Sequence, residues 1–156
     1  MLTSVLLGNT NIVVYRDDLN HATVSGNKLH KLKPNIELAK ERGCGGVLSF
    51  GGPYSNHLHA LAWACKNSGL KSVGFVRGEL HESLTPTLND CRNWGMTLVA
   101  IPRNYYRDYQ DALSKFGKPC LADDVDLQLD LKNHHVLDVE KMLVIPEGGS
   151  LSLIHI

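Results

Sequence analysis

Short apolar runs alternate with amphipathic stretches along most of this chain. The runs are four or five residues long, as buried strands often are, and they lie at residues 12–16, 46–50, 72–76, 97–101 and 142–145. The clearest helical pattern is formed by Leu58, Leu61, Ala62 and Cys65, which fall at i, i+3, i+4 and i+7. One face of that helix is therefore apolar, and Gly69 is suited to end it.

Glycine and proline set the limits of three further predicted helices, at residues 34–43, 85–95 and 106–117. The first begins at Pro34, because proline suits the first helical turn, and ends at a glycine that can take the left-handed cap. The second begins with Thr85-Pro86, a capping residue followed by proline at the first helical position. The polar run 20–31 is predicted to be a loop, and residues 121–141 have no clear pattern.

Strands and helices that alternate at this spacing predict βαβ units. The sequence therefore indicates an α/β fold, with a parallel sheet flanked by helices on both faces.

Composition narrows the possible partners. The 156 residues are 43% apolar, enough for one ordinary core or for part of a larger one. Sixteen basic and sixteen acidic residues balance, without a basic stripe, so nucleic acid and anionic membranes are not expected partners. We find neither a secretory signal nor a stretch long enough to cross a membrane, and expect a cytoplasmic protein.

Metal binding is not expected either. The four cysteines are widely spaced, without a CxxC pair, so each is interpreted as a reduced thiol in an apolar stretch. His57 and His59 are two residues apart, and such residues do not share a helix face.

Two segments contain candidate chemistry. One is SGNKLHKL at residues 25–32, which has two lysines three residues apart, and the other is SFGGPYSNH at residues 49–57. The second places a glycine turn between a strand and the start of a helix, where free N–H groups suit a carboxylate or a phosphate. Taken alone, these residues indicate only an α/β ligand-binding domain. A non-catalytic phosphate- or nucleotide-binding domain, with residues 51–57 as an anion cradle, is therefore one reading.

The strings GNKLHKL, SFGGPYSNH and VIPEGGS, in this order, resemble the 1-aminocyclopropane-1-carboxylate deaminase and D-cysteine desulfhydrase family. The resemblance runs from about Val14 to Ser150. It implies a pyridoxal 5'-phosphate-dependent enzyme with a fold like that of the tryptophan synthase β-subunit. By this resemblance Lys28 carries the cofactor, Asn27 adjoins it, and Lys31 helps to hold its phosphate.

The same resemblance also implies roles for the residues of the glycine turn. It implies that Asn56 lies beside the phenolic oxygen of the cofactor, that Ser55 faces the substrate and takes part in catalysis, and that His57 contacts the substrate carboxylate. The implied enzyme is a lyase or deaminase of a small amino acid. D-cysteine desulfhydrase, which gives pyruvate, sulfide and ammonia, is placed ahead of the cyclopropane deaminase.

Family members are about twice as long as this chain, and are expected to be homodimers at full length. The resemblance predicts that residues 1–33 belong to a large cofactor domain, that residues 34–140 form a small α/β domain, and that residues 141–150 return to the large one. Residues 151–156, LSLIHI, match the translation of a transposon end used in sequencing libraries, and are interpreted as adapter read-through. The fragment itself is expected to be inactive and poorly soluble, because the strands at residues 12–16 and 142–145 would have uncovered apolar faces and edges.

Overall fold

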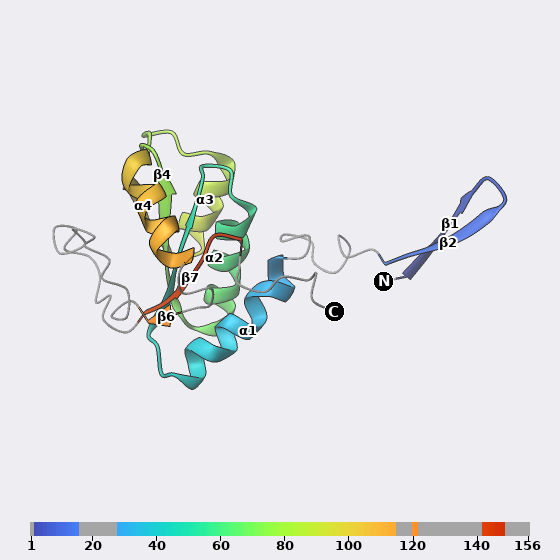
Figure 1. The fold of residues 1–156 in the computed structure, drawn as a ribbon, viewed down its shortest axis with the longest axis horizontal. Coiled ribbons are helices and arrows are strands. Elements are labelled where there is room, and N and C mark those ends of the chain that lie inside the picture. The colour runs from blue at the N-terminus through green and yellow to red at the C-terminus, as the bar shows by residue number, and fades with distance from the viewer. Residues whose placement is uncertain (1, 16–27, 115–119, 122–141, 149–156) are drawn as a thin grey trace.

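The computed structural model describes residues 2–15, 28–114, 120–121 and 142–148. These residues form a two-stranded hairpin and a five-stranded sheet with four helices (Figure 1). The strand order in the sheet is β5-β4-β3-β7-β6. Its parallel strands are β3 (Gly46–Gly51), β4 (Lys71–Arg77), β5 (Met96–Ile101) and β7 (Met142–Ile145). The short β6 (Cys120–Leu121) runs antiparallel to β7.

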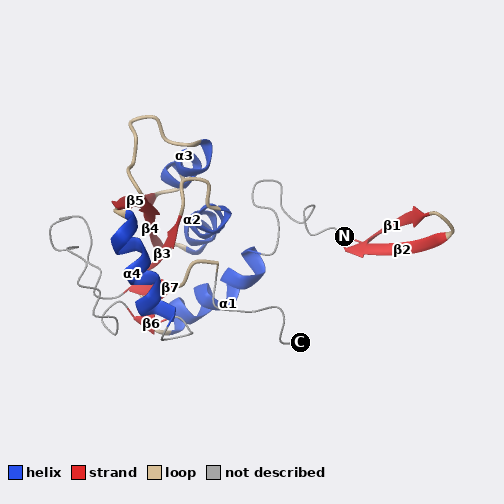
Figure 2. Cartoon of the chain, turned by 45° about the horizontal axis from the view of Figure 1, so that its top comes forward, coloured by secondary structure: helices blue, strands red, loops and turns tan. Residues whose placement is uncertain are grey.

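The helices cover both faces of this sheet (Figure 2). On one face lie α1 (Lys28–Glu41), α2 (Asn56–Ser68) and α3 (Pro86–Asn93), and on the other lies α4 (Arg103–Ser114). The predicted α/β fold, with a parallel sheet flanked by helices, is therefore confirmed.

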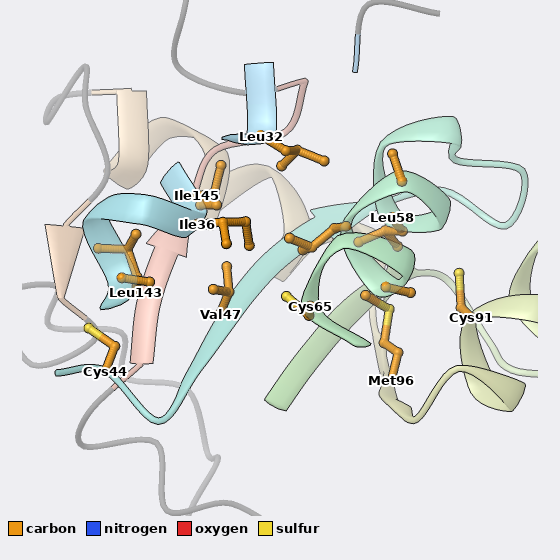
Figure 3. Packing of buried hydrophobic residues seen from close by; sticks show 14 of the residues in the cluster. Leu32, Ile36, Cys44, Val47, Leu58, Cys65, Cys91, Met96, Leu143 and Ile145 are labelled. Atoms are coloured by element: carbon orange, nitrogen blue, oxygen red, sulfur yellow. The ribbon is translucent and has the colours of Figure 1, made fainter. Parts of the chain in front are cut away.

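Alternation along the strands divides the buried residues into two cores. Val47, Leu143 and Ile145 pack with α1, α2 and α3, as Figure 3 shows, whereas their neighbours Leu48 and Val144 belong to the core under α4. Successive side chains of a strand point to opposite faces, so a central strand needs apolar residues on both. All six residues of β3 are buried accordingly.

Local signals predicted α2 and α3 accurately. Ser55 caps α2, and Gly69 ends it with a φ of 70°. Thr85 caps α3, and its hydroxyl oxygen accepts a hydrogen bond from the N–H of Leu88. The predicted strands at 46–50, 72–76, 97–101 and 142–145 also occur, with small differences at their ends. The last predicted helix is confirmed through Ser114, whereas Gly117 lies outside the described residues.

The predicted start of the first helix is wrong. α1 begins at Lys28, so Pro34 lies within the helix, and residues 28–31 are helical where a loop was predicted. Leu32, Ile36 and Ala39 are buried, which shows that the apolar stripe of α1 begins before the proline. Packing of that stripe outweighs the hydrogen bond that proline removes. Residues 20–27 lie outside the described part.

The N-terminal strand pairs with a partner that the sequence pattern did not reveal. β1 (Leu2–Leu7) and β2 (Thr10–Tyr15) form an antiparallel hairpin, with Gly8 in its turn at a φ of 61°. β2 covers most of the strand predicted at residues 12–16. Both strands expose apolar side chains, and Leu6 is 73% exposed.

β7 is more fully paired than was expected. The C-terminal strand was predicted to leave its edges uncovered, but it lies between β3 and β6, and all four of its residues are buried. That expectation is wrong for this chain. The division into domains near residue 140 stays a prediction. No helix in the described part of the chain is long and apolar enough to cross a bilayer.

Candidate functional site

The carboxyl end of β3 turns tightly into α2 because residue 51 has no side chain. A Cβ atom at Gly51 would lie 2.5 Å from Ser55 Oγ and 2.8 Å from Leu58 Cγ. The N–H of Ser55 donates to the Gly52 carbonyl over 3.1 Å, which closes the turn. The glycine pair therefore brings the start of α2 directly above the end of the central strand.

The first turn of α2 offers free backbone donors. Ser55 Oγ accepts a hydrogen bond of 3.2 Å from the N–H of Leu58. The first N–H groups of a helix have no partner within it, and among the described residues those of Asn56 and His57 have none elsewhere. This end of α2 suits an anionic group. Asn56 is exposed, Ser55 is partly buried and His57 is buried.

His57 belongs to a buried polar line that joins three elements. Its Nε2 lies 2.8 Å from Ser49 Oγ on β3, and the Ser49 hydroxyl donates to the carbonyl of Ile145 on β7 over 2.7 Å. Burial, followed by the positive charges of Lys28 and Lys31, lowers the pKa of His57 from 6.5 to about 4. The ring is therefore neutral near pH 7.

The lysines lie in the first turn of α1, and both are partly buried. α1 packs against α2, and the charges of Lys28 and Lys31 both act on His57. The structure thus brings the lysine segment and the glycine turn together. Asn27 lies outside the described part.

Two side chains beside the turn were not assigned to the site from the sequence. Arg77, which ends β4, lies so close to Gly52 that a Cβ atom there would be 3.6 Å from Arg77 Nη2. Thr85 Oγ1 donates to the carbonyl of Pro53, and so ties the start of α3 to the same turn. The pairing of β3 with β4 could have indicated Arg77, since neighbouring parallel strands end at one edge of a sheet.

Arg77 also contacts the opposite face of the sheet. Its guanidinium carbon lies 5.6 Å from the ring centre of Tyr106 on α4. Burial and the neighbouring Glu147 carboxylate raise the pKa of Tyr106 above its ordinary value. Glu147 follows β7, so charged groups at the ends of β4 and β7 both lie close to Tyr106.

The fold matches that of a solved structure. The crystal structure of a homologue of 1-aminocyclopropane-1-carboxylate (ACC) deaminase superposes with a TM-score of 0.58 at 23% identity. The match covers 89% of this chain and 38% of that one. The described sheet and helices are therefore part of the α/β fold found in ACC deaminase homologues.

Sequence relatives identify the family. A Thermotoga maritima protein provisionally named 1-aminocyclopropane-1-carboxylate deaminase is 35% identical over 144 residues, which is 92% of this chain and 41% of that protein. A rice protein provisionally named mitochondrial D-cysteine desulfhydrase 2 is 28% identical over 91% of this chain and 37% of its own length. No protein-family model matches the chain. The chain belongs to the ACC deaminase and D-cysteine desulfhydrase family, and it spans about two fifths of the length of these relatives.

Proposed function

We propose that this chain provides the lysine segment and the glycine turn of a pyridoxal-phosphate-dependent lyase or deaminase that acts on a small amino acid. One observation supports this most directly: the charges of Lys28 and Lys31 both act on His57, which adjoins Ser55 and Asn56. Groups more than twenty residues apart in sequence thus act on one another, which supports a shared site. A purely anion-binding turn would use a lysine only as a cation, whereas an aldehyde cofactor with a phosphate would use one lysine as an amine and the other as a cation.

The described residues fit the cofactor in chemical type. Lys28 offers a primary amine for its aldehyde, and Lys31, one helical turn further along α1, offers a cation for its phosphate. Asn56, with its exposed side chain at the start of α2, is proposed to bind the phenolic oxygen. Asn27 is proposed to adjoin the cofactor. The bound cofactor would act as an electron sink for the substrate.

Ser55 and Lys28 are the proposed catalytic groups of this chain. The Ser55 oxygen accepts a hydrogen bond from the N–H of Leu58, which leaves its hydroxyl proton free to be donated to a substrate. The Lys28 amine, once it is released from the cofactor, can carry a proton at Nζ. We propose that residue 57 meets the substrate carboxylate through its backbone N–H, because its neutral ring already contacts Ser49.

We propose D-cysteine as the substrate ahead of ACC, and the names of the relatives include both activities. The full-length protein would be incubated with each compound, and sulfide and ammonia would be measured. D-cysteine should release both products, whereas ACC contains no sulfur and can release only ammonia. Ammonia from ACC together with no sulfide from D-cysteine would reverse the order. The homodimer and the cytoplasmic location stay predictions.

The lysine assignment is tested by reduction with borohydride in the presence of the cofactor, followed by peptide mass mapping of the full-length protein. The label should lie on Lys28, and Lys28→Ala should lose it together with at least about a hundredfold in turnover. Lys40, an exposed lysine in the last turn of the same helix, provides the matched control Lys40→Ala, which should keep both. A label on Lys31, or on no peptide of this chain, would contradict the proposal.

A further inference from the structure

Two hydrogen bonds join the Ile145 carbonyl, the Ser49 hydroxyl and the His57 ring, and they determine which of these groups donates a proton in each contact. Ser49 is fully buried and His57 is 4% exposed. A serine hydroxyl has one proton, and a backbone carbonyl can only accept. The 2.7 Å contact with the Ile145 carbonyl therefore uses the Ser49 proton. The 2.8 Å contact between Ser49 Oγ and His57 Nε2 must then be donated by the ring.

This arrangement leaves His57 Nδ1 with a bare lone pair. A neutral imidazole that is protonated at Nε2 accepts at Nδ1. Nδ1 is buried and has no hydrogen-bond partner among the described residues. Because a buried acceptor without a partner is costly, native sites rarely leave one unused. We therefore expect a hydrogen-bond donor to bind the Nδ1 lone pair, although no described residue does so in this structure.

The charged donors that act on His57 belong to α1. Lys28 acts on His57 more strongly than Lys31 does, and these are the two side-chain charges that affect it in the described part of the chain. The neighbouring positions on the other two elements, Ser49 of β3 and Ile145 of β7, have no charge. An ammonium group is a donor only, so it complements a bare ring nitrogen.

We propose that Ser49 and His57 are positioning residues: the Ile145 carbonyl, acting through Ser49, fixes the Nε2–H tautomer of His57, so that Nδ1 accepts a hydrogen bond from the ammonium of Lys28. The amine is thereby oriented toward the turn at Gly51 and Gly52. The role of Lys28 rests on the proposed function, whereas the tautomer needs no cofactor. His57 thus acts as an acceptor and not as a cation.

The test is nitrogen NMR of the cofactor-free full-length protein labelled in its histidines, with His57 assigned by the signal lost in His57→Gln. Between pH 6 and pH 8 the ring should show a protonated Nε2 and a bare Nδ1, and should not titrate. Ser49→Ala should lose the fixed tautomer. Ser72→Ala, which removes another buried serine hydroxyl at the far end of the neighbouring strand, should keep it.

A second set of variants identifies the donor. Lys28→Met should move the Nδ1 resonance toward that of an imidazole without a donor, while the tautomer stays fixed, and Lys31→Met should move it less. If Ser49→Ala does not fold, the wild-type spectrum still decides the tautomer.

Two results would overturn the inference. One is a wild-type His57 that is protonated at Nδ1, or on both nitrogens, at neutral pH. The other is an Nδ1 resonance that does not respond to Lys28→Met. Neither result depends on cofactor binding, so both can be told apart from a failure of borohydride to label Lys28, which would contradict the proposed function.

Discussion

Replacement of Gly51 by alanine should disrupt the turn on which the proposed site depends. The added Cβ would lie 2.5 Å from Ser55 Oγ and 2.8 Å from Leu58 Cγ, which is far inside normal contact distances. Both neighbours are held in place, since Ser55 caps α2 and Leu58 is fully buried. Overpacking of this kind costs about 1–3 kcal/mol. In a chain of this size each kcal/mol lowers Tm by about 2–4 °C.

Gly52→Ala is the matched control, because its Cβ would lie at an ordinary contact distance of 3.6 Å from Arg77 Nη2. Urea and thermal denaturation of the two variants and of the wild type would give the difference in free energy of unfolding. We expect Gly51→Ala to be clearly less stable, and the full-length Gly51→Ala protein to have an altered cofactor absorption spectrum. Equal stability of the two variants would show that the turn can relax, and would refute the steric argument.

Three further predictions concern buried groups. Because the pKa of His57 is lowered from 6.5 to about 4, the unfolded chain binds this proton more readily. The resulting stability is complete above pH 6.5 and is lost as the pH falls toward 4, by at most roughly 3 kcal/mol, so urea denaturation of His57→Gln should depend less on pH in this range. Burial raises the pKa of Cys65 to about 12 and, with the charge of Asp90, that of Cys91 to about 12. A thiolate-selective reagent at pH 8 should therefore label both cysteines only after denaturation, and rapid labelling of the folded chain would contradict this. Phe50 is fully buried and stacks on Phe75 at 5.2 Å, so Phe50→Ala should cost about 3–5 kcal/mol in urea denaturation, and a loss below about 1 kcal/mol would show that the ring is not packed as described.

Local chemistry was enough to predict several elements from the sequence. Ser55 and Gly69 at the ends of α2, and Thr85-Pro86 at the start of α3, act within one or two turns of the chain. The apolar runs of β3, β4 and β5 predicted buried parallel strands, because such runs must be covered on both faces. The motif strings also indicated the family, since they preserve residue types in a fixed order.

Long-range packing determined the features of the fold and of the site that local sequence patterns did not predict. Helix propensity favoured a start at Pro34, whereas burial of Leu32 against the sheet extends α1 back to Lys28. The hydrogen bond from Ser49 to the Ile145 carbonyl joins residues 96 positions apart, and no local pattern predicts such a pair. It arises because β7 pairs with β3. The sequence alone therefore determined which residues could take part in chemistry. The tertiary structure decided that the His57 ring is buried, neutral and in contact with Ser49, because its pKa and its hydrogen bonds depend on groups from three other elements.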